Sequence, residues 1–167
     1  TNNPGTSIAD IIVDGSIAVP HAVGGAIEAM AVTAVDNTNG VWQYSTDNGS
    51  SWSNFSDSSG EVSLVTASRL LDGTASGAST NKIRYVPALN STDSATFTFR
   101  AWDKASGTVG GTADTTSNGA TTAFSLASDT ASISVSGGNA LPEASALPSV
   151  ISFSEDTTGN INLSALT

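Results

Sequence analysis

The chain has 167 residues, with 15 acidic and 5 basic side chains, one His, no Cys and a net charge of -10. This length suits one domain, or one domain and part of another, and allows a core without a disulfide or a metal. The absence of Cys excludes disulfide scaffolds, thiolate metal sites and thiol nucleophiles. Five scattered cations exclude a basic surface for nucleic acid.

The rest of the composition favours strands and turns. The chain contains 27 Ser, 21 Thr, 12 Asn and 16 Gly, whereas charged residues make up only 12%. Ser, Thr, Asn and Gly are typical of strand surfaces and turns. No apolar run approaches the ~18 residues of a membrane span, so we expect no membrane insertion. Because the chain shows neither an initiator Met nor a signal peptide, we expect it to be a fragment of a longer protein.

The first part of the chain alternates short apolar runs with turn residues. Residues 8–13 are one such run, and Pro20 within residues 16–25 indicates an edge or a loop. Residues 26–35 mix helix-forming and strand-forming residues. We interpret them as a strand buried on both faces, because β-turn residues flank them.

The clearest local pattern is a β-hairpin over residues 41–55. Trp42 and Tyr44 share one face of its first strand, residues 47–49 (Asp-Asn-Gly) form the turn, and Trp52 lies on the return.

The second part of the chain contains further strand patterns. A weak alternation covers residues 62–71, a flexible loop is expected at 72–81, and stronger strands are expected at 82–86, 95–102 and 130–135. Residues 103–122 form a long polar loop, and loops of this length are usually functional or disordered.

About seven or more short strands with frequent turns predict an all-β sandwich of two antiparallel sheets. The expected core is Ile8, Ile11, Val32, Trp42, Tyr44, Leu64, Leu70, Ile83, Tyr85, Phe97, Phe99, Trp102, Ile133 and Val135. The domain is expected over residues 1–136, followed by a linker at 137–149.

A series of segments resembles one repeat of very large bacterial surface adhesins. The segments are GVWQYSTDNGSSWSNF, RLLDG, KIRYVPALN, ATFTFRAWD, DTTSNGATTAFS and DTASISV, in this order within residues 1–136. They are similar to the cadherin-like or immunoglobulin-like tandem repeats of type I secreted, RTX-type adhesins. Residues 150–167 are similar to the opening strand of the next repeat, with Gly5 and Gly159 in equivalent positions.

The resemblance implies a structural extender repeat on the bacterial cell surface. Such repeats support cell adhesion and biofilm formation, their partners are the neighbouring repeats of the same chain, and calcium between modules commonly stiffens them. Where the family carries an Asp-rich stretch, residues 18–25 (AVPHAVGG) have no carboxylate. The remaining calcium candidates are Asp103, Asn139, Glu155 and Asp156.

Three alternatives have weaker support in the sequence. Residues 36–40 fit a metal loop, but a hairpin turn explains them better. The long 103–122 loop and exposed aromatic residues would suit a carbohydrate-binding module for cell-surface glycans, although core packing explains Trp42, Tyr44 and Trp52 better. An enzyme is not expected, because His21 has no activated nucleophile near it in the sequence and no catalytic motif is present.

Overall fold

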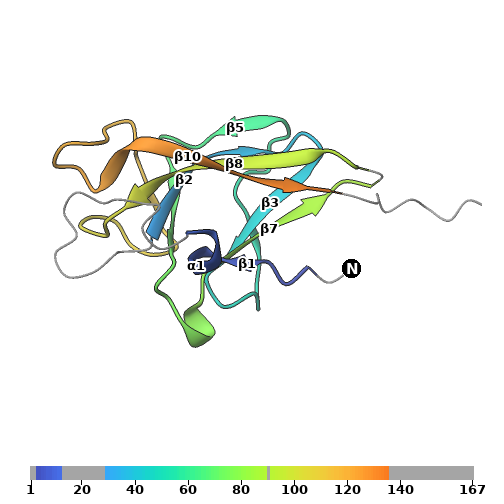
Figure 1. Cartoon of the computed structure of the whole chain (residues 1–167), viewed down its shortest axis with the longest axis horizontal. Helices are drawn as coiled ribbons and strands as arrows, with labels where there is room; N and C mark the ends of the chain where they lie inside the picture. Colours follow the sequence, from blue (N-terminus) through green and yellow to red (C-terminus); the bar gives the residue numbers. More distant parts are fainter. Residues whose placement is uncertain (1–2, 13–28, 90, 136–167) are drawn as a thin grey trace, which may run out of the picture.

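The structure is a computed structural model that describes residues 3–12, 29–89 and 91–135. It is an all-β sandwich of two antiparallel sheets, as the sequence predicts (Figure 1). The first sheet has the strand order β1 (Thr6–Ser7), β7 (Lys82–Pro87), β3 (Gly40–Ser45), β4 (Ser53–Asn54). The second has the order β10 (Phe124–Ser134), β8 (Ser94–Trp102), β2 (Ala29–Asp36), β6 (Ser68–Asp72), β9 (Thr112–Ala113), and β5 (Glu61–Ser63) also pairs with β2.

The apolar run at residues 8–13 begins with a short helix, α1 (Ile8–Ile11), and the 3-10 helix η1 covers Gly77–Ser79. The Ser7 hydroxyl caps α1 by accepting a hydrogen bond from the Asp10 backbone N–H at 3.1 Å. An uncapped N–H at this position would lack a partner, so Ser7 favours the helical turn. The turn directs Ile8 into the core.

Strand β2 is buried on both faces, as the sequence predicts, and separates two apolar cores. The inner core lies between the sheets and contains Met30 and Val32 of β2 together with the aromatic side chains Trp42, Tyr85, Phe97 and Phe99. The outer core lies on the other face of the second sheet and contains Ala29, Ala31, Leu70, Trp102, Ala123 and Phe124.

Two expected strands differ in extent from the sequence prediction. Residues 62–71 form two strands, β5 and β6, because a turn in which the Ala67 N–H bonds the Leu64 carbonyl at 2.9 Å interrupts them. Strand β10 begins at Phe124, earlier than the predicted residue 130, and a register shift separates Phe124 from Ser128.

The predicted core is confirmed at nine positions: Ile8, Val32, Trp42, Leu70, Ile83, Tyr85, Phe97, Phe99 and Trp102. The prediction is wrong for Ile133, which is 37% exposed because β10 is the last strand of its sheet among the described residues. Ile11, Tyr44, Leu64 and Val135 are only partly buried against the inner core.

The chain enters β1 and leaves β10 at the same end of the sandwich. Strand β1 runs antiparallel to β7, and the Asn3 side-chain amide bonds the Tyr85 carbonyl near the end of β7. Strand β8 begins at this end, and Ser134 at the end of β10 pairs with Ser94 at the start of β8. We call this the β7–β8 end. The other end of β8, next to Asp103, is the Asp103 end.

Candidate functional site

Asp103 follows β8 directly and is the one predicted calcium residue that the structure describes. Its backbone N–H bonds the Ala123 carbonyl at 3.0 Å, and its carboxylate accepts a hydrogen bond from the Ala105 N–H at 2.8 Å. The carboxylate therefore fixes the turn that opens the 103–122 loop. Within residues 3–12, 29–89 and 91–135, no three His, Cys, Asp or Glu side chains come together to hold a metal.

Asn139, Glu155 and Asp156 lie outside the described residues, so the four-residue calcium site stays a prediction. The linker at 137–149, the opening strand at 150–167 and His21 also lie outside them. An ion shared between Asp103 and the later residues requires the chain to return from Ser134 along the length of the sheet, because Asp103 and Ser134 lie at opposite ends.

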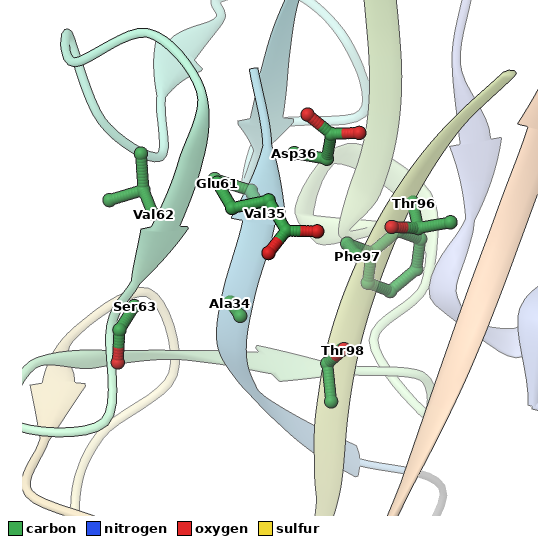
Figure 2. Close-up of a pocket in the computed structure, with 9 residues that line it drawn as sticks. All are labelled: Ala34, Val35, Asp36, Glu61, Val62, Ser63, Thr96, Phe97 and Thr98. Atoms are coloured by element: carbon green, nitrogen blue, oxygen red, sulfur yellow. The ribbon is translucent and has the colours of Figure 1, made fainter. Parts of the chain in front are cut away.

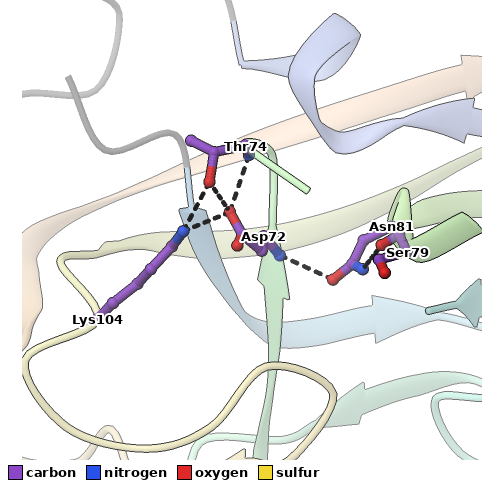
Figure 3. Close-up of polar contacts among 5 residues, drawn as sticks. All are labelled: Asp72, Thr74, Ser79, Asn81 and Lys104. Atoms are coloured by element: carbon purple, nitrogen blue, oxygen red, sulfur yellow. Dashed lines mark hydrogen bonds and ion pairs between the residues drawn. The ribbon is translucent and has the colours of Figure 1, made fainter. Parts of the chain in front are cut away.

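Lys104 follows Asp103 in the sequence, but its ammonium forms an ion pair with another carboxylate, that of Asp72. The Lys104 ammonium lies 2.6 Å from the Asp72 carboxylate and also donates to the Thr74 hydroxyl at 2.8 Å (Figure 3). Partial burial alone raises the pKa of Asp72, but hydrogen bonds from Lys104 and Thr74 outweigh burial and hold the pKa below its usual value. This pair ties the start of the loop to β6.

The 103–122 loop is attached to the sheet along its length. It contains β9, which pairs with β6, and the Gly110 N–H and Gly111 carbonyl bond the Leu70 backbone at 2.8 and 3.0 Å. The buried Thr115 hydroxyl lies 2.8 Å from the Ser68 hydroxyl, and the Trp102 indole N–H donates to the Ser106 carbonyl at 2.7 Å. The loop thus covers the outer core.

A groove of about 240 Å³ lies on the outer face of the second sheet, towards the β7–β8 end. Figure 2 shows the Asp36 and Glu61 carboxylates and the Thr96 and Thr98 hydroxyls around it. Asp36 and Glu61 are paired across β2 and β5, and neither Lys nor Arg lines the groove. Like charges in directly opposite positions destabilise a sheet. The groove can offer hydrogen-bond acceptors to a polar ligand, but it has no aromatic platform beyond the buried Phe97.

The residues proposed as a carbohydrate platform are engaged within the protein. Trp42 is 4% exposed. The Arg84 guanidinium lies over the Trp52 ring, 4.1 Å from its centroid, and the Arg69 guanidinium lies 4.5 Å from the Tyr44 centroid. Stacking of a sugar on Trp52 would have to displace a cation–π contact or use the opposite face of the ring.

The hairpin turn predicted at residues 47–49 is confirmed, whereas the one predicted at 36–40 is wrong, because this turn joins β2 of the second sheet to β3 of the first and the two strands do not pair. The Asp36 carboxylate accepts the Thr38 N–H at 2.9 Å in the turn between β2 and β3. In the β3–β4 hairpin, Asn48 has a φ of 59° and Gly49 a φ of 87°. Hydrogen bonds from Ser51 and Ser45 lower the pKa of Asp47 to about 2, because they stabilise its charged form.

A cavity of about 320 Å³ that the sequence does not predict lies between the two sheets, on the side formed by β1 and β10. Trp42 and Tyr85 are among the residues that line it, and the Trp42 indole N–H and the Tyr85 hydroxyl have no hydrogen-bond partner among the described residues. The exposed Ile133 also lines this cavity. No local pattern signals it, because it forms where strands distant in the sequence meet.

Comparison with known proteins adds no assignment. No family model matches the chain, and neither the curated proteins nor the solved structures give a significant match. In the part of the chain that the structure describes, no helix has the length and apolar character needed to cross a membrane.

Proposed function

We propose that the chain is a structural extender repeat of a large bacterial surface adhesin, located outside the cell, with neighbouring repeats of the same chain as its partners. In this role it supports cell adhesion and biofilm formation by holding the adhesive part of the protein away from the cell, and it catalyses no reaction.

The main support is the use of polar side chains within the longest described loop. In residues 103–122, Asp103 holds its own turn, Lys104 bonds β6 and Thr115 bonds Ser68. Lys104 and Thr115 anchor the loop to the sandwich, while other polar side chains of the loop, such as Asp114 and Thr116, are exposed. A long loop that is fixed to its own sheet suits a module whose task is mechanical.

The length of the linker is compatible with a rod, although the described chain enters and leaves at one end. Residues 137–149 span up to about 43–47 Å when extended. The nine residues of β8 span about 30 Å. The linker and the residues that follow it are therefore long enough to bring the chain to the opposite end of the module.

Small-angle scattering of two copies joined in tandem tests this function. If the repeats form a rod, the maximum dimension of the two-copy protein is about twice that of one copy. The single copy is the matched control. A compact or freely jointed two-copy protein with calcium present would contradict the extender role.

Calcium stiffening belongs to the same proposal, with Asp103, Asn139, Glu155 and Asp156 as ligands. A ligand that binds only the folded state raises the melting temperature. We expect chelation to lower it by several degrees in the native chain and to have no effect in the E155Q/D156N variant. An equal response of the two proteins would argue against these ligands.

The carbohydrate-binding role is the second candidate, and the Asp36–Glu61 groove is the observation that favours it. A glycan array tests it, with the T96V/T98V variant as a control that removes two hydroxyls from the groove. Binding by the native chain and its loss in this variant would support the second candidate over the first.

A further inference from the structure

The cavity between the sheets lies beside a strand with an unpaired edge. Strand β10 is the last strand of the second sheet among the described residues, and it pairs only with β8. Ala131 and Ile133 of β10 line the cavity together with Trp42 and Phe97. An additional strand along β10 would place every second side chain over this cavity.

The chain that follows β10 contains a segment of the right pattern. Residues 150–154 read Val-Ile-Ser-Phe-Ser, so Ile151 and Phe153 share one face and Ser152 and Ser154 the other. Fifteen residues, 135–149, separate this segment from Ser134. Their r.m.s. span as a flexible chain is about 20 Å, and a short tether of this kind gives an effective concentration in the mM range.

We propose that Val150–Ser154 of the same chain docks antiparallel to β10 as an additional strand and places Ile151 and Phe153 over the cavity. The pattern fixes the register. Ile151 lies opposite Ile133, Phe153 lies opposite the small Ala131, and Ser152 lies opposite Ser132 on the outer face. This arrangement adds two apolar side chains to a wall that contains Trp42 and Phe97.

Repulsion between two carboxylates limits the length of the docked strand. In the same register, Glu155 lies opposite Asp129, and like charges in opposite positions disfavour pairing. The added strand therefore ends at Ser154.

The docked strand would also set the direction in which the chain leaves the module. This part of the inference rests on the proposed extender role. An antiparallel strand beside β10 carries the chain from the β7–β8 end towards the Asp103 end. Ser154 then lies opposite Thr130, which pairs with Thr98 midway along β8, and the docked strand directs the following residues towards the Asp103 end, where a rod requires the next module to begin.

A disulfide trap tests the docking in the full chain. Because the chain has no Cys, the S132C/S152C variant contains only the two thiols that the register places opposite each other. We expect a disulfide within the monomer after mild oxidation. The control variant S132C/S164C has a second thiol on the same tail but outside the docked segment, so we expect at least tenfold less crosslinking.

The other outcomes contradict the proposal in different ways. A disulfide found only in dimers would show that a second copy supplies the strand, and equal crosslinking in the control would show that the tail has no fixed register. A second measurement uses the I151D/F153D variant, with S152D/S154D as its matched control. For the β10 amides that do not bond to β8, we expect the hydrogen-exchange rate to rise at least tenfold in I151D/F153D and to stay unchanged in S152D/S154D. Unchanged exchange would overturn the docking.

These experiments use a single copy, so their failure is distinct from failure of the extender role. If the tandem protein is a rod but neither the disulfide nor the amide protection forms, the junction is fixed in another way. If both form but the tandem protein is compact, the docking holds and the extender role fails.

Discussion

The inner and outer cores of the second sheet differ in how completely the described residues close them. In the outer core, Trp102 is 1% exposed, and its indole N–H bonds the Ser106 carbonyl. In the inner core, the Trp42 indole N–H and the Tyr85 hydroxyl have no partner among the described residues, and the two residues line a cavity. A core covered by its own loop is complete within one module, whereas the open side of the inner core offers a place for further chain.

The largest expected effect comes from removal of the side chain at the centre of the outer core. W102A is expected to lower the free energy of unfolding by about 3–5 kcal/mol, because it leaves a cavity under the 103–122 loop. Urea unfolding measures the effect. The control is W52A, at a partly exposed Trp directly before β4, with an expected loss below that of W102A. Equal losses in W102A and W52A would mean that burial of Trp102 in the outer core stabilises the fold no more than the partly exposed Trp52 does.

Addition of atoms to the two cores should have opposite effects. A Cβ at Gly107, which has a φ of 85°, would lie 2.4 Å from the Leu70 Cδ1 atom, so G107A is expected to cost about 1–3 kcal/mol. A131V adds methyl groups beside the inner cavity and is expected to change stability by less than about 0.5 kcal/mol or to stabilise the protein. Thermal unfolding of both variants tests the difference, and a larger loss for A131V would show that the cavity is not open to added side chains.

Removal of a buried hydroxyl should distinguish the cores in the same way. T115V removes a hydroxyl that contacts Ser68 and the Val65 carbonyl, and it is expected to cost about 1–2 kcal/mol. Y85F removes a hydroxyl that has no partner among the described residues, so no loss is expected. Urea unfolding of the two variants measures both effects. A loss of more than about 1 kcal/mol for Y85F would indicate that this hydroxyl has a partner outside the described residues.

The smallest effect concerns the ion pair that holds the loop over the outer core. Because the pKa of Asp72 is lowered in the folded state, the pair stabilises the protein above the unfolded pKa of about 3.9 and loses this effect as the pH falls through the folded pKa. We expect D72N to lower stability by about 0.2–1 kcal/mol at pH 7, because the pair is partly exposed. The difference from the native chain should shrink below pH 4, and K104M should show the same trend. A pH-independent difference would contradict an electrostatic origin.

Local patterns predicted the strands with strong alternation. Phe97 and Phe99 of β8 point into the inner core as expected, and the hairpin around Asp47 has the expected turn. The capped turn at Ile8 was missed, because a single helical turn has no detectable period. The candidate calcium site was harder to predict from the sequence. Asp103 is the one predicted ligand within the described residues, and its carboxylate accepts a hydrogen bond from the Ala105 N–H.

The alternation of β2 shows why burial on two faces is difficult to assign from sequence. A register shift between Val32 and Ala34 moves Val35 to the inner core and leaves Ala34 and Asp36 at the outer groove. A strict period of two would place Val32 and Val35 on opposite faces. The shift depends on pairing with β8, which lies more than sixty residues away in the chain.

The sequence by itself determined the all-β class, the positions of the strong strands and the Asp-containing turns, because these depend on side-chain alternation and on local backbone preference. Tertiary structure alone decided that the 103–122 loop covers an outer core, that the chain enters and leaves the sandwich at one end, and that a cavity lies beside β10. These features arise from the order and direction of strands that are distant in the chain, and no local interaction specifies them.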